Sequence, residues 1–319
     1  MKTPVVLVTG FLGSGKTTLI SRLLEHPGMG ETAVIVNELG EIGIDHHLLR
    51  RVDERTVLLA SGCVCCVLRG DLVDELRDLL DRRDAGEVPH FVRIVVETTG
   101  IADPTPIVMT LLSDPVARNH YELESVVATV DGVHGLRGPE SVKQVAIADR
   151  LVITKADIAA PGGRSRIAEQ IARLNPSAPA REATFGEVDP EWLFDGPERD
   201  PRGGLERSSA NGPEPSEHDH DVGSCVLYLG EVDWTAFGIW LTMLLQARGS
   251  DILRVKGLLN VGGAGPVLVN CVQHAVHPPA HLDEWPDDDE RSRLVFIGHD
   301  LDVVRLQESL TAFDRVARS

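Results

Sequence analysis

A glycine-rich turn between an apolar run and a helix-forming run constrains this chain more than any other stretch. Residues 5–8 read Val-Val-Leu-Val, which is typical of a strand buried on both faces of a parallel sheet. The turn reads Gly-x-x-x-x-Gly-Lys-Thr over residues 10–17, and helix-forming residues continue over 17–24. That order of strand, loop and helix is the context in which this spacing forms a phosphate-binding loop.

Each polar group of this loop has an expected task in holding a nucleoside triphosphate. Glycines let backbone N–H groups turn inward around a phosphate. Lys16 brings a positive charge to the β- and γ-phosphates, which also serves catalysis, and Thr17 offers a hydroxyl to Mg²⁺. The nucleotide-binding residues expected here are Gly10, Gly13, Ser14, Gly15, Lys16, Thr17 and Thr18. An ordinary glycine-rich turn is the alternative, which the regular flanking segments disfavour.

An acidic residue closes a second apolar run. Residues 91–96 predict a buried strand that ends at Glu97, and Gly100 follows three residues later. This spacing is typical of the second magnesium-handling element of a phosphate-loop NTPase. We expect Glu97 to hold the ion through water, and the N–H of Gly100 to approach the γ-phosphate and report its loss.

Another predicted strand, residues 33–36, runs into a segment that mixes acids with glycines. In a nucleotide-dependent switch protein, an acidic loop at such a place senses Mg²⁺ or a second metal ion. A solvated acidic turn is the alternative for residues 37–45. Glu38 and Glu41 are both candidates for positioning the attacking water.

The tetrapeptide Thr154-Lys155-Ala156-Asp157 closes a predicted strand at 151–154. It resembles the N/T-K-x-D element of GTPases, whose aspartate accepts two hydrogen bonds from guanine. Adenine offers no such pair of donors on that edge, so a site built for them rejects it. We therefore expect Thr154, Lys155 and Asp157 to bind the guanine base, with threonine standing where asparagine is commoner.

Three of the five cysteines, Cys63, Cys65 and Cys66, lie within four residues. Thiolates suit Zn²⁺ and also hold Co²⁺ or Cu⁺. On an extended chain Cys63 and Cys65 point to one side, so this pair is favoured for a shared ion. Two or three ligands from one loop leave a tetrahedral metal incomplete, which suits a carrier better than a closed structural site. A redox pair or a structural cluster is the alternative, whereas Cys225 and Cys271 are predicted to be buried in apolar strands.

Charge and length limit the class of protein. A net charge of −18 disfavours nucleic-acid and anionic-membrane surfaces, which would repel this chain. No apolar run approaches the roughly 20 residues that a membrane helix needs. We expect a cytoplasmic protein with cations or proteins as partners, and neither nucleic acid nor membrane.

Composition divides the chain into three parts. We expect a nucleotide-binding domain over 1–185, a linker over 186–223 that is rich in Gly, Pro, Asp, Glu and Ser, and an α+β domain over 224–319. His218 and His220 lie in an acidic run of the linker, which is either solvated or a weak metal-collecting segment.

Apolar periodicity predicts the remaining elements. In the first domain, strands are expected over 57–59, 125–130 and, at a sheet edge, 179–184, with helices over 71–83, 141–150 and 164–174. In the second domain, strands are expected over 225–229, 252–260, 267–276 and 293–297, with helices over 233–246 and 301–317.

These motifs together resemble the CobW-like family of GTP-dependent metallochaperones, which belongs with the nickel-enzyme maturation GTPases. The resemblance rests on residues 10–18, 37–41, 62–66, 97–104 and 154–157, and on the C-terminal runs 253–257 and 273–278. Leu39 stands where the family usually has phenylalanine, a change expected to alter loop packing rather than chemistry.

The resemblance implies an α/β phosphate-loop NTPase of the SIMIBI type with a mostly parallel sheet, followed by a smaller α+β domain. It implies slow hydrolysis of Mg·GTP to GDP and phosphate, coupled to transfer of zinc, or next cobalt, to a metalloprotein or metal-cofactor assembly client. A homodimer is one assembly it allows. We expect Mg·GTP to order residues 37–45 and 97–103 and to complete the metal site at the cysteines.

Two rival functions stay open at this point. A phosphate-loop small-molecule kinase would carry an Arg-rich lid, and no such segment lies between the predicted helices. A metal-sensing or storage protein would bind GTP without hydrolysing it. Zinc and cobalt share ligands and geometry, so the sequence does not choose between the metals.

Overall fold

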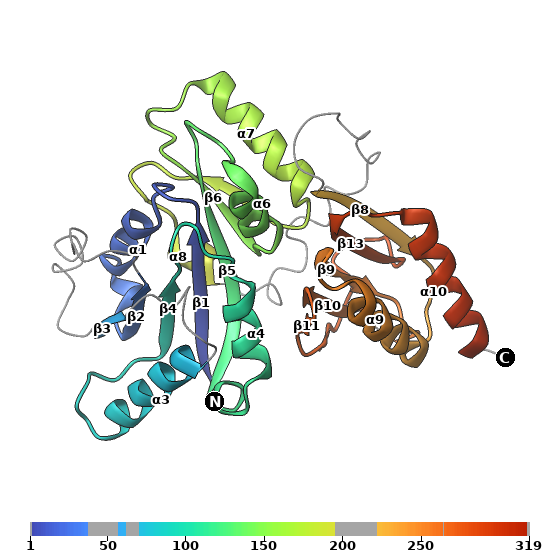
Figure 1. The fold of residues 1–319 in the computed structure, drawn as a ribbon, viewed down its shortest axis with the longest axis horizontal. Helices are drawn as coiled ribbons and strands as arrows, with labels where there is room; N and C mark the ends of the chain where they lie inside the picture. The colour runs from blue at the N-terminus through green and yellow to red at the C-terminus, as the bar shows by residue number, and fades with distance from the viewer. Residues whose placement is uncertain (1, 38–56, 62–69, 195–221, 264, 318–319) are drawn as a thin grey trace. The chain divides into compact units, whose positions relative to one another are not determined.

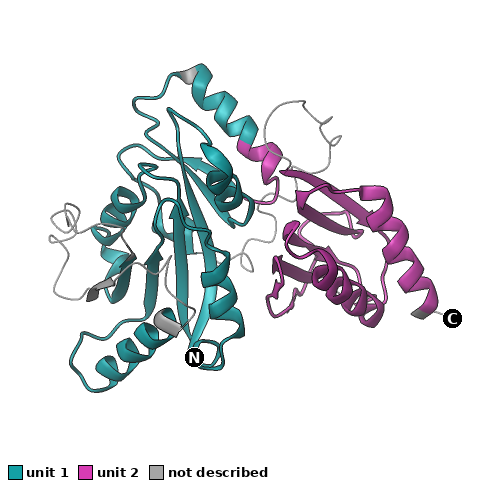
Figure 2. Cartoon of the chain, in the orientation of Figure 1, with its two compact units in different colours: residues 1–170, 179–197 teal, residues 171–178, 198–319 magenta. Residues whose placement is uncertain are grey.

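We describe a computed structural model of the chain over residues 2–37, 57–61, 70–194, 222–263 and 265–317 (Figure 1). It forms two compact units, which Figure 2 colours separately. Unit 1 comprises Met1–Gln170 and Pro179–Pro197, and unit 2 comprises Ile171–Ala178 and Glu198–Ser319. Within the described ranges, no helix combines the length and the apolarity needed to cross a membrane.

Unit 1 is built on a parallel sheet that, in the described part of the chain, has seven strands in the order β3-β2-β4-β1-β5-β6-β7. The strands are β1 (Thr3–Gly10), β2 (Thr32–Asn37), β3 (Val57–Ser61), β4 (Arg93–Glu97), β5 (Tyr121–Asp131), β6 (Arg150–Thr154) and β7 (Ala180–Glu182). Parallel strands need crossover connections and are covered on both faces, which explains their continuous apolar runs. The predicted mostly parallel α/β sheet is confirmed.

Helices alternate with these strands (Figure 1). They are α1 (Lys16–Leu24), the 3₁₀ helix η1 (Pro27–Met29), α3 (Gly70–Asp84), α4 (Thr105–Ser113), α5 (Pro115–His120), α6 (Gly138–Ala146), α7 (Pro161–Leu174) and α8 (Pro190–Phe194). Leu19 and Leu23 of α1 pack with Val6 and Val8 of β1 in one apolar core. This packing anchors the loop between β1 and α1.

The helix α8 lies within the segment 186–223, which the sequence predicts to be a linker. Leu193 and Phe194 are buried in the same core as β1 and α1. The guanidinium groups of Arg150 and Arg181 lie 5.2 and 4.7 Å from the ring centroid of Trp192. These apolar residues are few and are flanked by polar residues, so the sequence shows no helical periodicity here. The domain limits 1–185, 186–223 and 224–319 stay a prediction.

Two predicted elements end earlier than expected. The helix predicted over 141–150 stops at Ala146, because Asp149 turns back to exchange backbone and side-chain hydrogen bonds with Val126. The strand predicted over 267–276 breaks after Val272, since Gln273 adopts a left-handed conformation with φ of 49° and starts a hairpin. Helices α4 and α5 had no prediction.

Unit 2 contains an antiparallel sheet that, among the described residues, has six strands in the order β11-β10-β9-β13-β8, with β12 on β10. The elements are β8 (Val222–Leu229), α9 (Trp234–Arg248), β9 (Ile252–Leu259), β10 (Val267–Val272), β11 (Ala275–Val276), β12 (Ala280–His281), β13 (Ser292–His299) and α10 (Val303–Ala317). Asp233 caps α9, and Phe237 of this helix belongs to the same apolar core as Phe296 and Cys271. The buried position predicted for Cys271 is confirmed, whereas Cys225 is only half-buried.

Candidate nucleotide-binding site

The loop between β1 and α1 leaves the sheet at its centre, since β1 lies between β4 and β5. Ligands of open parallel sheets bind beyond the carboxyl ends of the strands, where this loop lies. Gly10, Gly13 and Gly15 all have positive φ, at 143°, 70° and 91°. At Gly10 a side chain is excluded outright, because its Cβ would meet the hydroxyl and carbonyl oxygens of Thr129.

Lys16 starts α1 and its side chain folds over the loop. Its Nζ donates to the carbonyl oxygens of Gly10 at 2.9 Å and Phe11 at 3.3 Å, and the residue is 7% exposed. The N–H groups of the first helical turn have no partners within a helix and attract anions. The ammonium and the helix terminus therefore place positive charge at the predicted phosphate position. Thr18, also predicted to bind the nucleotide, is exposed on the same turn.

Thr17 and Glu97 meet at the end of the sheet. The Thr17 Oγ1 donates to Glu97 Oε1 at 2.8 Å, and Glu97 is 5% exposed. Strand register explains the meeting, because Val8 of β1 pairs with Glu97 at the end of β4. Hydroxyl and carboxylate oxygens are the donors that Mg²⁺ prefers, so this pair fits the ion that both residues were predicted to hold.

The segment after Glu97 lies directly against the phosphate loop. The Thr98 N–H donates to Val8 O at 3.0 Å, and a Cβ on Gly100 would lie 2.5 Å from the Leu12 backbone nitrogen. Backbone packs on backbone here. We predicted an approach of Gly100 to the γ-phosphate, and the structure adds that glycine is required for close contact with the loop itself.

Thr154 is buried against the phosphate loop. Its hydroxyl donates to Ser14 O at 2.6 Å and to Val130 O at 3.2 Å, and the residue is 3% exposed. The hydroxyl thus joins the end of β6 to the phosphate loop, and the role of Thr154 at the base stays a prediction.

Lys155 and Asp157 follow the carboxyl end of β6. Lys155 has φ of 56°, and its ammonium lies 2.8 Å from Oδ2 of Asp131 at the end of β5. Asp131 also accepts hydrogen bonds from His134 and from the Val133 N–H. Burial raises the pKa of the Asp131 carboxyl, but these hydrogen bonds outweigh burial and hold the pKa below its usual range. Asp157, which is predicted to bind the base, is exposed.

Replacing Asp131 with asparagine should weaken GTP binding by about 3- to 10-fold, because the amide keeps the turn but loses the charge that fixes Lys155. Titration with a fluorescent GTP analogue measures this. Since the pKa of Asp131 is lowered, the pair is complete above about pH 4 and is lost only as the pH falls further. Glu182→Gln, which breaks the 2.7 Å ion pair with Arg164, is the control and should bind normally. If Asp131→Asn binds the GTP analogue as tightly as wild type does, the position of Lys155 does not matter for GTP binding.

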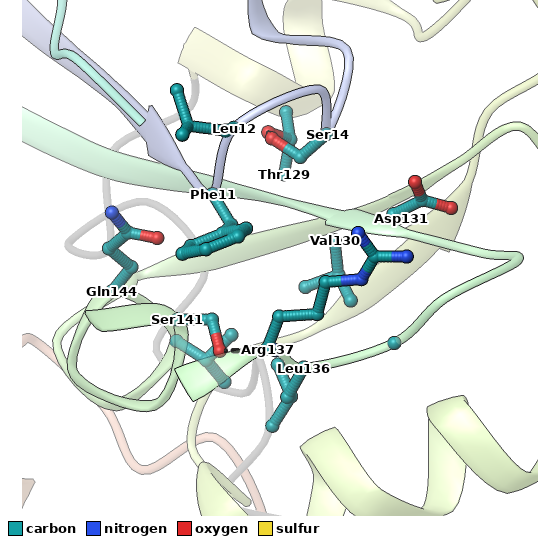
Figure 3. Close-up of a pocket in the computed structure, with 12 residues that line it drawn as sticks. Phe11, Leu12, Ser14, Thr129, Val130, Asp131, Leu136, Arg137, Ser141 and Gln144 are labelled. Carbon is teal, nitrogen blue, oxygen red and sulfur yellow. Dashed lines mark hydrogen bonds between the residues drawn. The ribbon is translucent and has the colours of Figure 1, made fainter. Parts of the chain in front are cut away.

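A small cavity of about 10 Å³ lies between the phosphate loop, β5 and α6 (Figure 3). Its lining includes Phe11, Leu12 and Ser14 of the loop, Thr129 and Asp131 of β5, and Ser141 and Gln144 of α6. This volume holds about one water molecule. It is therefore a gap behind the loop and cannot take a nucleotide.

Sequence reasoning missed three residues of this site: Thr129, Asp131 and Gln144. Thr129 shares a 2.6 Å hydrogen bond with Ser14. Asp131 offered a signal, because it is an acid at the end of an apolar strand, as Glu97 is. Gln144 offered none, since its contacts lie more than 40 positions away in the chain.

Residues 4–182 match the family model "CobW/HypB/UreG, nucleotide-binding domain", and residues 223–314 match "Cobalamin synthesis protein cobW C-terminal domain". The chain belongs to the CobW/HypB/UreG family. The phosphate loop, Glu97 and the Thr154–Asp157 element all fall within the first match, as the resemblance predicted.

Named members of the family are similar over nearly the whole chain. The zinc chaperone YjiA of Escherichia coli is 34% identical, over 92% of this chain and 93% of its own. The zinc chaperone CobW of Pseudomonas aeruginosa is 31% identical, over 97% and 91%. The crystal structure of the Zn(II)-bound YjiA GTPase superposes with a TM-score of 0.71 at 30% identity, covering 98% of this chain and 99% of that one.

Several predicted residues lie outside the described ranges. They are the candidate water-positioning residues Glu38 and Glu41, the candidate metal ligands Cys63, Cys65 and Cys66, and the linker residues His218 and His220. Their roles stay predictions. Where the structure is described, no three His, Cys, Asp or Glu side chains come together as a metal site.

Proposed function

We propose that this chain is a GTPase that binds Zn²⁺ at its cysteine cluster and delivers it to a client protein. The observation that carries the nucleotide part is the contact of Thr17 with Glu97 at 2.8 Å beside the buried Lys16. The metal part is supported by Cys63, Cys65 and Cys66 and by relatives named zinc chaperones. Cobalt is the next candidate, because it accepts the same ligands.

The residues of the site have separate tasks in hydrolysis. Lys16 neutralises charge on the β- and γ-phosphates, and the oxygens of Thr17 and Glu97 hold Mg²⁺. Mg²⁺ held by these two residues would supply charge to offset the negative charge that develops when water attacks the γ-phosphorus and the bond to the β-phosphate oxygen breaks. Glu38 or Glu41 positions that water. Lys155 and Asp157 hold the guanine base.

Strand order supports coupling between nucleotide and metal. Ser61 ends β3 two residues before Cys63 and pairs with Asn37 at the end of β2. The neighbouring residue Val36 pairs with Glu97 on the other side of β2. The strand that precedes the cysteine segment in the sequence and the strand that carries Glu97 therefore end at the same carboxyl edge of the sheet, which supports coupling between nucleotide and metal.

The test is a Zn²⁺ titration with a non-hydrolysable GTP analogue and then with GDP, both with Mg²⁺. We expect about 10-fold tighter Zn²⁺ binding in the GTP state, a coupling typical of allosteric sites. Cys65→Ser should remove the difference, whereas Cys225→Ser, on a half-buried thiol of unit 2, should keep it. Identical affinity in both states would leave a nucleotide hydrolase without a chaperone role.

Competition with Co²⁺ and Ni²⁺ in the same titration identifies the metal. Phosphate release from GTP without an acceptor separates the proposal from a kinase and from a protein that binds GTP without turnover. The client, the homodimer and the cytoplasmic location stay predictions.

A further inference from the structure

Side chains of helix α6 bond to the segment that follows Glu97. The Gln144 Nε2 donates to the carbonyl oxygens of Gly100 at 3.2 Å and Ala102 at 3.1 Å. One residue earlier, the Lys143 ammonium lies 3.4 Å from Asp103. Two successive side chains of one helix thus hold three of four consecutive loop residues.

The opposite side of this segment touches the phosphate loop. A Cβ on Gly100 would lie 2.5 Å from the backbone nitrogen of Leu12 and 2.6 Å from its Cα. Gly100 is therefore enclosed between Gln144 and the phosphate loop. A displacement of this segment away from α6 changes its distance from the loop.

Gln144 is a polar residue that is only 1% exposed, and burial of such a side chain costs free energy. A buried carboxamide costs free energy unless its polar atoms are bonded. Its amino group donates to two carbonyl groups of the segment after Glu97, and among the described residues its Oε1 has no hydrogen-bond partner. In Figure 3 the side chain lies beside Phe11 of the phosphate loop, where both line the small cavity. An apolar side chain would fill this place at lower cost if packing were its whole purpose.

We propose, on the basis of the triphosphate placement proposed above, that Gln144 is a positioning residue for GTP hydrolysis. It fixes the carbonyl groups of Gly100 and Ala102, so that the N–H of Gly100 stays within hydrogen-bond reach of the γ-phosphate. GDP lacks that phosphate, so its binding does not depend on Gln144. The residue acts through the segment and does not touch the reacting atoms.

Gln144→Met removes both donors and nearly conserves volume. We expect kcat for GTP to fall by about 10-fold or more, while KM for GTP and the Kd for GDP change by less than about 3-fold. Hydrogen exchange of residues 98–104 should become faster in the GTP-analogue state. Gln170→Met, the same change at an exposed glutamine of α7, is the matched control and should behave as wild type.

Three results would overturn the proposal: an unchanged kcat, an equal loss of GDP binding, or unchanged exchange of the segment. An equal loss of GDP binding would mean that Gln144 only supports the fold. If the variant does not fold, hydrogen exchange of the wild-type protein still tests the proposal. The GTP analogue should slow exchange of residues 98–104, and GDP should not. Equal protection by both nucleotides contradicts the proposal. A separate variant tests the phosphate site itself. Normal nucleotide binding by Lys16→Ala would contradict the proposed triphosphate site, whatever Gln144 does.

Discussion

Lys16→Ala should abolish GTP turnover and weaken nucleotide binding by at least about 100-fold, because a preorganised charge at the transferred phosphate is worth that much or more. Lys16 is held over the loop by the carbonyl groups of Gly10 and Phe11, so the charge is in place before the nucleotide arrives. Calorimetric titration with GDP and a phosphate-release assay with GTP measure the two losses.

The control for this variant is Lys2→Ala, which removes a lysine from an exposed position next to β1. It should bind and hydrolyse GTP as wild type does. Thermal unfolding of both variants separates loss of the site from loss of the fold. Turnover of GTP at the wild-type rate by Lys16→Ala would show that residues 10–18 are not the phosphate site.

Gly100→Ala should slow GTP turnover by at least about 10-fold and destabilise unit 1 by about 1–3 kcal/mol, the usual cost of overpacking. The added Cβ would lie 2.5 Å from the Leu12 backbone nitrogen and 2.6 Å from the Leu12 Cα, and these backbone atoms cannot turn aside as the end of a flexible side chain can. Either the segment or the phosphate loop must shift. Single-turnover hydrolysis and denaturant unfolding measure the two effects.

Gly163→Ala is the matched control, because a Cβ there meets nothing within 4 Å. It lies in α7 and should leave turnover unchanged while raising stability slightly, since alanine favours a helix. Combining Gly100→Ala with Gln144→Met should cost less than the sum of the single changes, because both displace the same segment. Full activity of Gly100→Ala would mean that close contact with Leu12 is not needed for hydrolysis.

Features that depend on neighbours in the chain were predictable. The motifs of the phosphate loop, Glu97 and the Thr154–Asp157 element were recognised from spacing and from the strands before them, and their site roles stay predictions. The strands of unit 1 and the helices α1, α3, α6 and α7 were also predicted, whereas α4 and α5 were not. The helix α8 was missed, because its apolar residues are few and become a face only when β1 and α1 are beside them.

Residue roles that depend on strand order were not predictable in the same way. The Thr154 hydroxyl donates to the carbonyl oxygen of Ser14, which is 140 positions away, and no local pattern predicted this contact. Asp131 meets Lys155 because β5 and β6 are neighbours. Gln144 reaches Gly100 across 44 positions.

The sequence by itself determined the family of this protein and predicted its site chemistry: a phosphate loop, a carboxylate for magnesium, a guanine-type element and a thiol cluster. These are short runs whose backbone conformation and side-chain spacing are set locally. Only the tertiary structure decided which side chains support the loop from below and which helix holds the segment after Glu97. Such contacts join residues far apart in the chain, and they exist only once β1 has been placed between β4 and β5 in the sheet.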